Sequence, residues 1–177
     1  ASVPSFIEWF HRLVAMVAGF LILGLAGLAW YDRVDRRTAA TATGAAVLLP
    51  LQVSVGTVTV TLGGLVPDGY SVTSQAAHLG VAVCIFTLLV VTALRGMDGT
   101  YDDPPGERAR RALVAAALVV AAAALFSRVV PLFPYAPATQ ATFVGAALAG
   151  YASLLAAARW LDDPASRALA VVAAGAV

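Results

Sequence analysis

The chain has 177 residues, of which 60% are hydrophobic and only 12% are charged, and its net charge is +1. A soluble globular domain carries about 25% charged residues, so this composition excludes an ordinary soluble domain. The near-neutral charge gives no reason to expect nucleic acid as a partner, and membrane lipid is the expected surrounding.

Five apolar runs reach the roughly 20 residues that a membrane-spanning helix needs. They cover about residues 6–31, 38–65, 72–94, 109–130 and 139–160. A sixth run, after Pro164, is shorter and is expected to be truncated, tilted or peripheral. Because a helix satisfies its backbone hydrogen bonds internally, the runs predict an all-α fold, a polytopic membrane helical bundle with five to six transmembrane helices.

A polar segment between the third and fourth runs divides the chain. It contains three aspartates and the consecutive prolines Pro104 and Pro105, a composition that cannot cross a membrane. We expect residues 1–95 to form a first helical half that holds both histidines of the chain. Residues 96–110 are expected to form a cytoplasmic loop, and residues 111–177 a second helical half without histidine.

Arginines gather in every second loop, and this predicts the orientation of the chain. They lie between the first and second, the third and fourth, and the fifth and sixth runs, with Arg128 as the exception. Arginine-rich short loops stay on the cytoplasmic side. The sequence therefore predicts a multi-pass protein of the plasma membrane, with the chain start towards the outer side.

The two histidines, His11 and His78, are predicted at one depth. His11 lies seven residues beyond Pro4 and His78 seven residues beyond Ser71, which places each about 10 Å below the outer end of its helix. Ionisable side chains inside a membrane are usually functional, and paired histidines are common axial ligands of haem iron. The alternative is two unrelated buried histidines, each bonded to a neighbour.

The residues around His11 favour a large flat ligand over a bare metal ion. Ala15, Ala18 and Gly19 continue its face of the helix and leave room, although small residues also allow helices to pack closely. A zinc or copper site would need further ligands, and Glu8 is the only other candidate at this level. Haem is therefore the predicted cofactor.

Three charged residues are predicted near such a haem. Glu8 precedes His11 by one turn, so it could handle protons or substrate, or simply pair with Arg12 four residues later. Arg12 and Arg128 are predicted to meet the haem propionates, which need cationic partners.

Two weaker patterns accompany the histidines. Gln52, Gly56, Thr59 and Gly63 share one face of the second run, where helix packing is the favoured interpretation for each residue taken singly. Residues 74–80 resemble residues 139–145, with Phe143 in the place of His78. If this is an internal repeat, the second half has lost its ligand.

The chain resembles the haem A synthase family over about its first 95 residues. The resemblance rests on Glu8-Trp9-Phe10-His11-Arg12, Leu51-Gln52-Val53-Ser54-Val55-Gly56 and Ala77-His78-Leu79. It implies that residues 1–95 are a haem-binding half and that the chain oxidises the C8 methyl of haem O to the formyl of haem A for terminal oxidases. It implies iron ligation by His11 and His78 and a catalytic role for Glu8.

Whether the chain is an enzyme stays open at this point. The bound group would be haem b, or haem O as substrate. The alternatives are a non-catalytic haem-binding or structural subunit of a respiratory oxidase, and a bis-histidine cytochrome b. The resemblance suggests cytochrome oxidase subunits, haem O synthase or further copies of the chain as partners.

Overall fold

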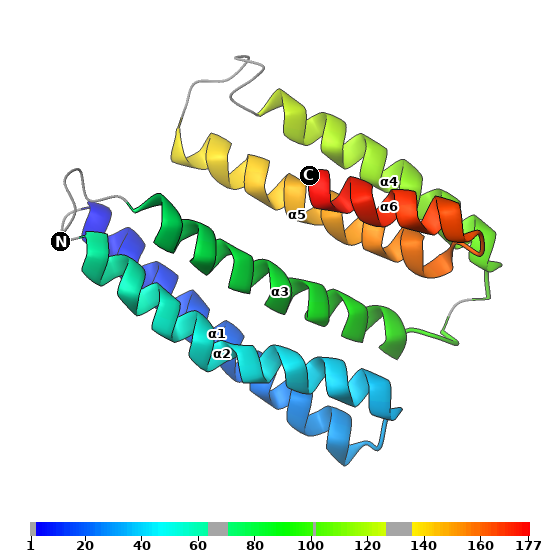
Figure 1. Ribbon diagram of the computed structural model, residues 1–177, viewed down its shortest axis with the longest axis horizontal. Helices are drawn as coiled ribbons and strands as arrows, with labels where there is room; N and C mark the ends of the chain where they lie inside the picture. The colour runs from blue at the N-terminus through cyan, green and yellow to red at the C-terminus, as the bar shows by residue number, and fades with distance from the viewer. Residues whose placement is uncertain (1–2, 64–70, 101, 127–135) are drawn as a thin grey trace. The chain divides into compact units, whose positions relative to one another are not determined.

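The computed structural model describes residues 3–63, 71–100, 102–126 and 136–177, without the side chains of residues 3–8, 62 and 63. The regular elements of this described part are six helices (Figure 1). They are α1 (Val3–Tyr31), α2 (Arg36–Gly63), α3 (Val72–Gly96), α4 (Pro105–Leu125), α5 (Pro137–Trp160) and α6 (Pro164–Ala176). The predicted all-α fold is confirmed.

Four of the described helices, α1, α2, α3 and α5, are long and apolar enough to cross a membrane. The chain is therefore a membrane protein. The helix α4 is not among the four, because its first two turns carry Glu107 and three arginines. The helix α6 has 13 residues. At 1.5 Å per residue it is about 20 Å long, shorter than the ~30 Å hydrocarbon core.

The chain forms two compact units, Ala1–Gly96 and Met97–Val177. In the first unit α2 packs against both α1 and α3. In the second unit α5 packs against both α4 and α6. Each unit is thus built on a central helix with two neighbours.

The turn between α1 and α2 is fixed by Asp35. Its carboxylate accepts hydrogen bonds from the backbone N–H groups of Arg37, at 2.8 Å, and Thr38, at 3.3 Å, and from the Thr38 hydroxyl. These bonds lower the pKa of Asp35, and the bond from the Thr38 hydroxyl has the largest effect. Next to the turn, Trp30 Nε1 of α1 donates to Thr43 Oγ1 of α2 at 2.9 Å. Four buried alanines pack there: Ala26, Ala29, Ala39 and Ala42.

Two hydrogen bonds between helices set the register of α3 on α2. Near one end Thr92 Oγ1 donates to Thr41 Oγ1 at 2.8 Å, and near the other Thr59 Oγ1 donates to the Ser74 carbonyl at 3.2 Å. Such bonds contribute about 0.6–2 kcal/mol each in a membrane. Because the two helices are antiparallel and bonded near both ends, the middle of α2 faces the stretch of α3 that carries His78.

The second unit is packed through small residues. Ala116, Leu154 and Ala174 form its buried cluster. A Cβ built on Gly150 of α5 would lie 2.8 Å from Val120 Cγ2 of α4, so that methyl group fills the space which glycine leaves. The end of α5 is tied by an ion pair between Arg159 and Asp98, at 2.5 Å.

Candidate functional site

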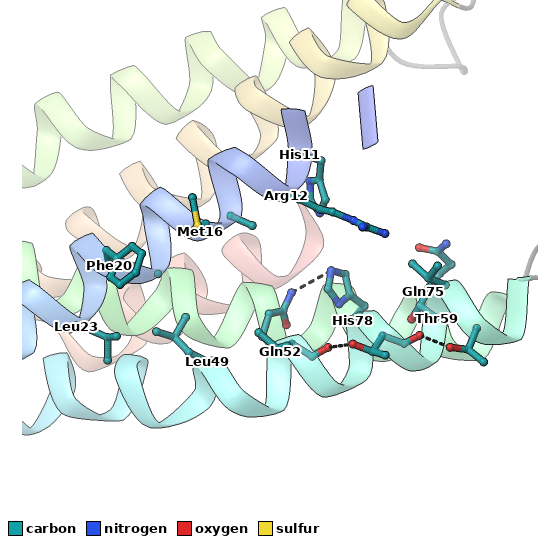
Figure 2. Close-up of a pocket in the computed structure, with 17 residues that line it drawn as sticks. His11, Arg12, Met16, Phe20, Leu23, Leu49, Gln52, Thr59, Gln75 and His78 are labelled. Atoms are coloured by element: carbon teal, nitrogen blue, oxygen red, sulfur yellow. Dashed lines mark hydrogen bonds between the residues drawn. The ribbon is translucent and has the colours of Figure 1, made fainter. Parts of the chain in front are cut away.

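A cavity of about 1010 Å³ lies in the first unit and is lined by residues of α1, α2 and α3. Ligand pockets usually measure roughly 300–1,000 Å³, so this one is large enough for a bulky ligand. Figure 2 shows its labelled residues, with the two histidines, Arg12, Thr59 and Gln75 towards one end and Phe20, Leu23 and Leu49 towards the other.

The cavity wall changes from polar to apolar along its length. From His11 to Leu23 the α1 wall runs for about 18 Å. Its far part consists of Met16, Gly19, Phe20 and Leu23, which carry no ionisable group. Met16 is 54% and Phe20 68% exposed, so this part of the wall borders the surroundings of the unit. The cavity suits a ligand with a polar end and a long apolar end.

The imidazole of His78 lies against the backbone of α2 at Gly56. A Cβ added at Gly56 would lie 3.0 Å from His78 Cε1, 3.4 Å from Nδ1 and 4.0 Å from Nε2. A side chain at this position would therefore make a tight contact with the ring, which would have to shift by a few tenths of an ångström. The glycine therefore supplies the space in which the half-buried ring is seated.

Gln52 holds the other side of the same ring. It lies one turn before Gly56 on α2, and its side-chain nitrogen Nε2 is 3.1 Å from His78 Nε2. His78 Nδ1 and Gln52 Oε1 are both buried, and within the described part of the chain neither has a hydrogen-bond partner. Buried polar atoms without partners are uncommon in folded proteins, so each requires an explanation.

His11 and Arg12 enter the cavity from α1. Both are exposed in the described chain, whereas His78 is half-buried between α2 and α3. Among the residues that the structure describes, no three or more His, Cys, Asp or Glu side chains gather as they would around a metal ion held by protein alone. The cavity thus offers two imidazoles and a guanidinium.

A sequence profile of the COX15-CtaA family of cytochrome oxidase assembly proteins matches residues 2–128 of the chain. The chain belongs to this family. The match covers more than half of the chain, including all three helices that line the cavity.

Curated relatives of this family member are also haem-processing proteins by name. A haem A synthase from Methylobacterium nodulans is 37% identical over 116 residues, which is 64% of this chain and 32% of the relative. A protohaem IX farnesyltransferase from Halobacterium salinarum is 33% identical over 104 residues, which is 59% of this chain and 22% of the relative. The chain thus spans between a fifth and a third of these relatives. No solved structure matches it.

The structure brings three of the five predicted site residues into one cavity: His11, Arg12 and His78. The side chain of Glu8 and the whole of Arg128 lie outside the described residues. Of the small residues predicted near His11, Ala15 and Gly19 line the cavity. The ligand roles of the histidines remain predictions.

Sequence reasoning missed several lining residues. Gln75, on α3, lies three residues before His78, a spacing that places two side chains on one helix face and could have identified it. Thr57 and Thr61 of α2 also line the cavity, with their hydroxyl groups bonded to carbonyls one turn back. Of the four residues predicted to share one face of α2, Gln52, Gly56 and Thr59 line the cavity, and the surroundings of Gly63 are outside the described part.

Proposed function

We propose that the cavity binds haem between His11 and His78, and that the chain takes part in haem A synthesis by acting on haem O. The observation that carries this proposal is the half-buried imidazole of His78, seated on Gly56 in a cavity that it shares with His11. Family membership and the similarity to a haem A synthase support the same reaction.

The residues present fit a haem. A porphyrin supplies four nitrogens to its iron, so two imidazoles complete the ligand set and no larger protein cluster is needed. Gln52 Oε1 is buried and without a hydrogen-bond partner among the described residues, so it requires a partner other than these residues. When bound, the iron supplies the redox chemistry.

The polar and apolar ends of the cavity favour one orientation of the haem. Arg12 and Gln75 line its polar end and can bind carboxylates, so we assign the haem propionates to them. Phe20, Leu23 and Leu49 line the apolar end, which accepts the isoprenoid chain of haem O. If arginine-rich loops are cytoplasmic, the propionate end faces the outer side of the plasma membrane.

Two residues whose side chains the structure does not describe, Glu8 and Arg128, complete the proposal. Oxidation of a methyl group to a formyl group with water as the source of oxygen passes four electrons to an electron acceptor and releases four protons. Glu8, one turn before His11, is a carboxylate that can accept protons from this step. Arg128 is a second cation for the propionates.

Haem O synthase is the partner that the relatives favour. The similarity covers only 22% of the protohaem IX farnesyltransferase, so that relative joins a segment like this chain to further sequence. We propose that the residues of this chain receive haem O from such an enzyme within the membrane.

The test begins with the purified full chain, co-expressed with a source of haem O. A low-spin haem spectrum that disappears in His11→Ala and His78→Ala is expected. Haem extracted from the membranes should contain haem A or its hydroxylated precursor, and Glu8→Gln should retain bound haem without this product. A chain without haem would refute the proposal, whereas bound haem without conversion would leave a cytochrome b or a non-catalytic oxidase subunit.

A further inference from the structure

The two ring nitrogens of His78 have different surroundings. Nδ1 is fully buried and lies near Gly56, on the side of the ring that faces the α2 backbone. Nε2 lies farther from Gly56 and points to the side of α1 and His11 (Figure 2). Nε2 is therefore the nitrogen that a ligand in the cavity can reach.

Gln52 occupies this reachable nitrogen. Its amide nitrogen lies 3.1 Å from Nε2, and an amide nitrogen only donates hydrogen bonds. With the amide nitrogen towards the ring, Gln52 donates and Nε2 accepts, so the proton of the neutral ring sits on Nδ1. This is the tautomer that iron ligation through Nε2 requires, because a metal binds the nitrogen that carries the lone pair.

We propose that Gln52 is a positioning residue that holds the His78 ring in the Nδ1–H tautomer, with the Nε2 lone pair ready for iron, and that iron replaces the amide at Nε2. The proposal rests on the proposed haem site. Charged and titratable groups on the cavity wall are His11 and Arg12 of α1, and the α2 and α3 lining residues around the ring add none.

The surroundings of the Gln52 amide oxygen, Oε1, agree with a positioning role. This oxygen is buried and has no hydrogen-bond partner within the described part of the chain. The position of the side chain therefore leaves one of its two polar atoms unbonded. A buried oxygen without a hydrogen bond is unfavourable, and an apolar residue at position 52 would avoid it. The arrangement becomes understandable if the amide is released when ligand enters and can then bond elsewhere.

The first experiment measures the tautomer without any haem. The chain has two histidines, so the His11→Ala variant, labelled with ¹⁵N-histidine in detergent, gives signals of His78 alone. In this background an Nδ1–H ring is expected. In Gln52→Leu and in Gln52→Asn, whose amide is one methylene too short, the Nε2–H form should become the major one. An unchanged tautomer in both variants would overturn the inference.

The second experiment measures haem affinity with both histidines present. In Gln52→Leu and Gln52→Asn most of the His78 rings should carry their proton on Nε2, where iron cannot bind. Haem affinity should therefore fall in proportion to the fraction of rings left in the Nδ1–H form. Gln140→Leu, a matched glutamine of α5, should bind haem like the parent chain.

The two experiments separate the inference from the haem proposal. A parent chain that binds no haem refutes the proposed function and leaves the tautomer result standing. A parent chain that binds haem, with equal affinity in the Gln52 variants, overturns the positioning role alone.

Discussion

Each of the two units has a glycine on its central helix that leaves space for a side chain of a neighbouring helix, but the side chains that fill the space differ. At Gly56 of α2 the space left by the missing side chain holds the His78 imidazole, next to a cavity. At Gly150 of α5 the corresponding space holds a methyl group of Val120, which is stiff and apolar. The role of a small residue in a membrane helix therefore depends on the side chain that faces it. Opposite an imidazole it provides space for the ring, and opposite an apolar side chain it allows two helices to pack closely.

The largest expected effect comes from filling the space at Gly56. In Gly56→Ala the new Cβ would lie 3.0 Å from His78 Cε1, so the ring must shift by a few tenths of an ångström and its position for a ligand changes. Haem affinity, measured by absorbance titration, should fall at least roughly tenfold, the lower end of the effect of disturbing a ligand's support. Helicity gains about 1 kcal/mol from alanine, so the fold should persist.

A matched control for this variant is available on α3. Gly80 lies two residues from His78, and a Cβ there meets nothing within 4 Å. Gly80→Ala should bind haem like the parent chain. Equal affinities for Gly56→Ala and Gly80→Ala would contradict the interpretation of Gly56 as a seat for the ring.

The next effect concerns stability in the second unit. A Cβ at Gly150 would lie 2.8 Å from Val120 Cγ2, and overpacking of this kind costs about 1–3 kcal/mol. Better helix propensity returns about 1 kcal/mol. Gly150→Ala should therefore lower the thermal midpoint in detergent without changing haem affinity. Gly145→Ala, where a Cβ meets nothing within 4 Å, should not lower the midpoint.

A smaller effect is expected from acid at the start of α4. The hydrogen bond from Arg110 is the main cause that lowers the pKa of Glu107 from 4.5 to about 2. A carboxylate with a lowered pKa stabilises the fold above its ordinary pKa, and this contribution disappears as the pH falls from 4.5 towards 2. The exposed ion pair makes the effect small.

The measurement for Glu107 is the thermal midpoint against pH, compared with Glu107→Gln. The parent chain should lose its advantage over the variant within that acid range, and the two should keep a constant difference near neutral pH. Parallel curves down to the lowest pH would show that Glu107 does not gain its charge stabilisation from Arg110.

The smallest effect is expected from placing a histidine in the second unit. Phe143 takes the place of His78 in the short repeat, but the sequence of residues 97–177 contains no second histidine to serve as the other ligand. Phe143→His should leave the number of haems per chain unchanged, as measured by pyridine haemochrome assay. A second bound haem would show that the two units are more alike than their glycine contacts indicate.

Much of the fold could be predicted from the sequence because membrane helices are encoded by length and apolarity. The first and last residues of the helices are harder to predict from the sequence. The helix α4 begins at Pro105, whereas the apolar run predicted a start at about residue 109. Proline is favoured in the first turn of a helix and Glu107 suits its positive end, so the prolines start the helix instead of extending the loop.

The site could be predicted in its parts and not in its assembly. The histidines, Gln52 and Gly56 are visible in the sequence, and a helical repeat places the last two on one face. The contact of His78 with both depends on the register of α3 on α2, which the bonds Thr92–Thr41 and Thr59–Ser74 fix. No single helix contains that information, because it arises from the pairing of two.

The seat of His78 also carries a lesson for constructing such sites. It consists of three positions on two antiparallel helices: a glutamine and a glycine one turn apart, and a histidine opposite. Only one of the three is a candidate ligand, and one has no side chain at all. A search or a design that considers only chemically reactive residues would omit the glycine. Copying the histidine alone onto another helix pair would therefore transfer the ligand without the place that holds it.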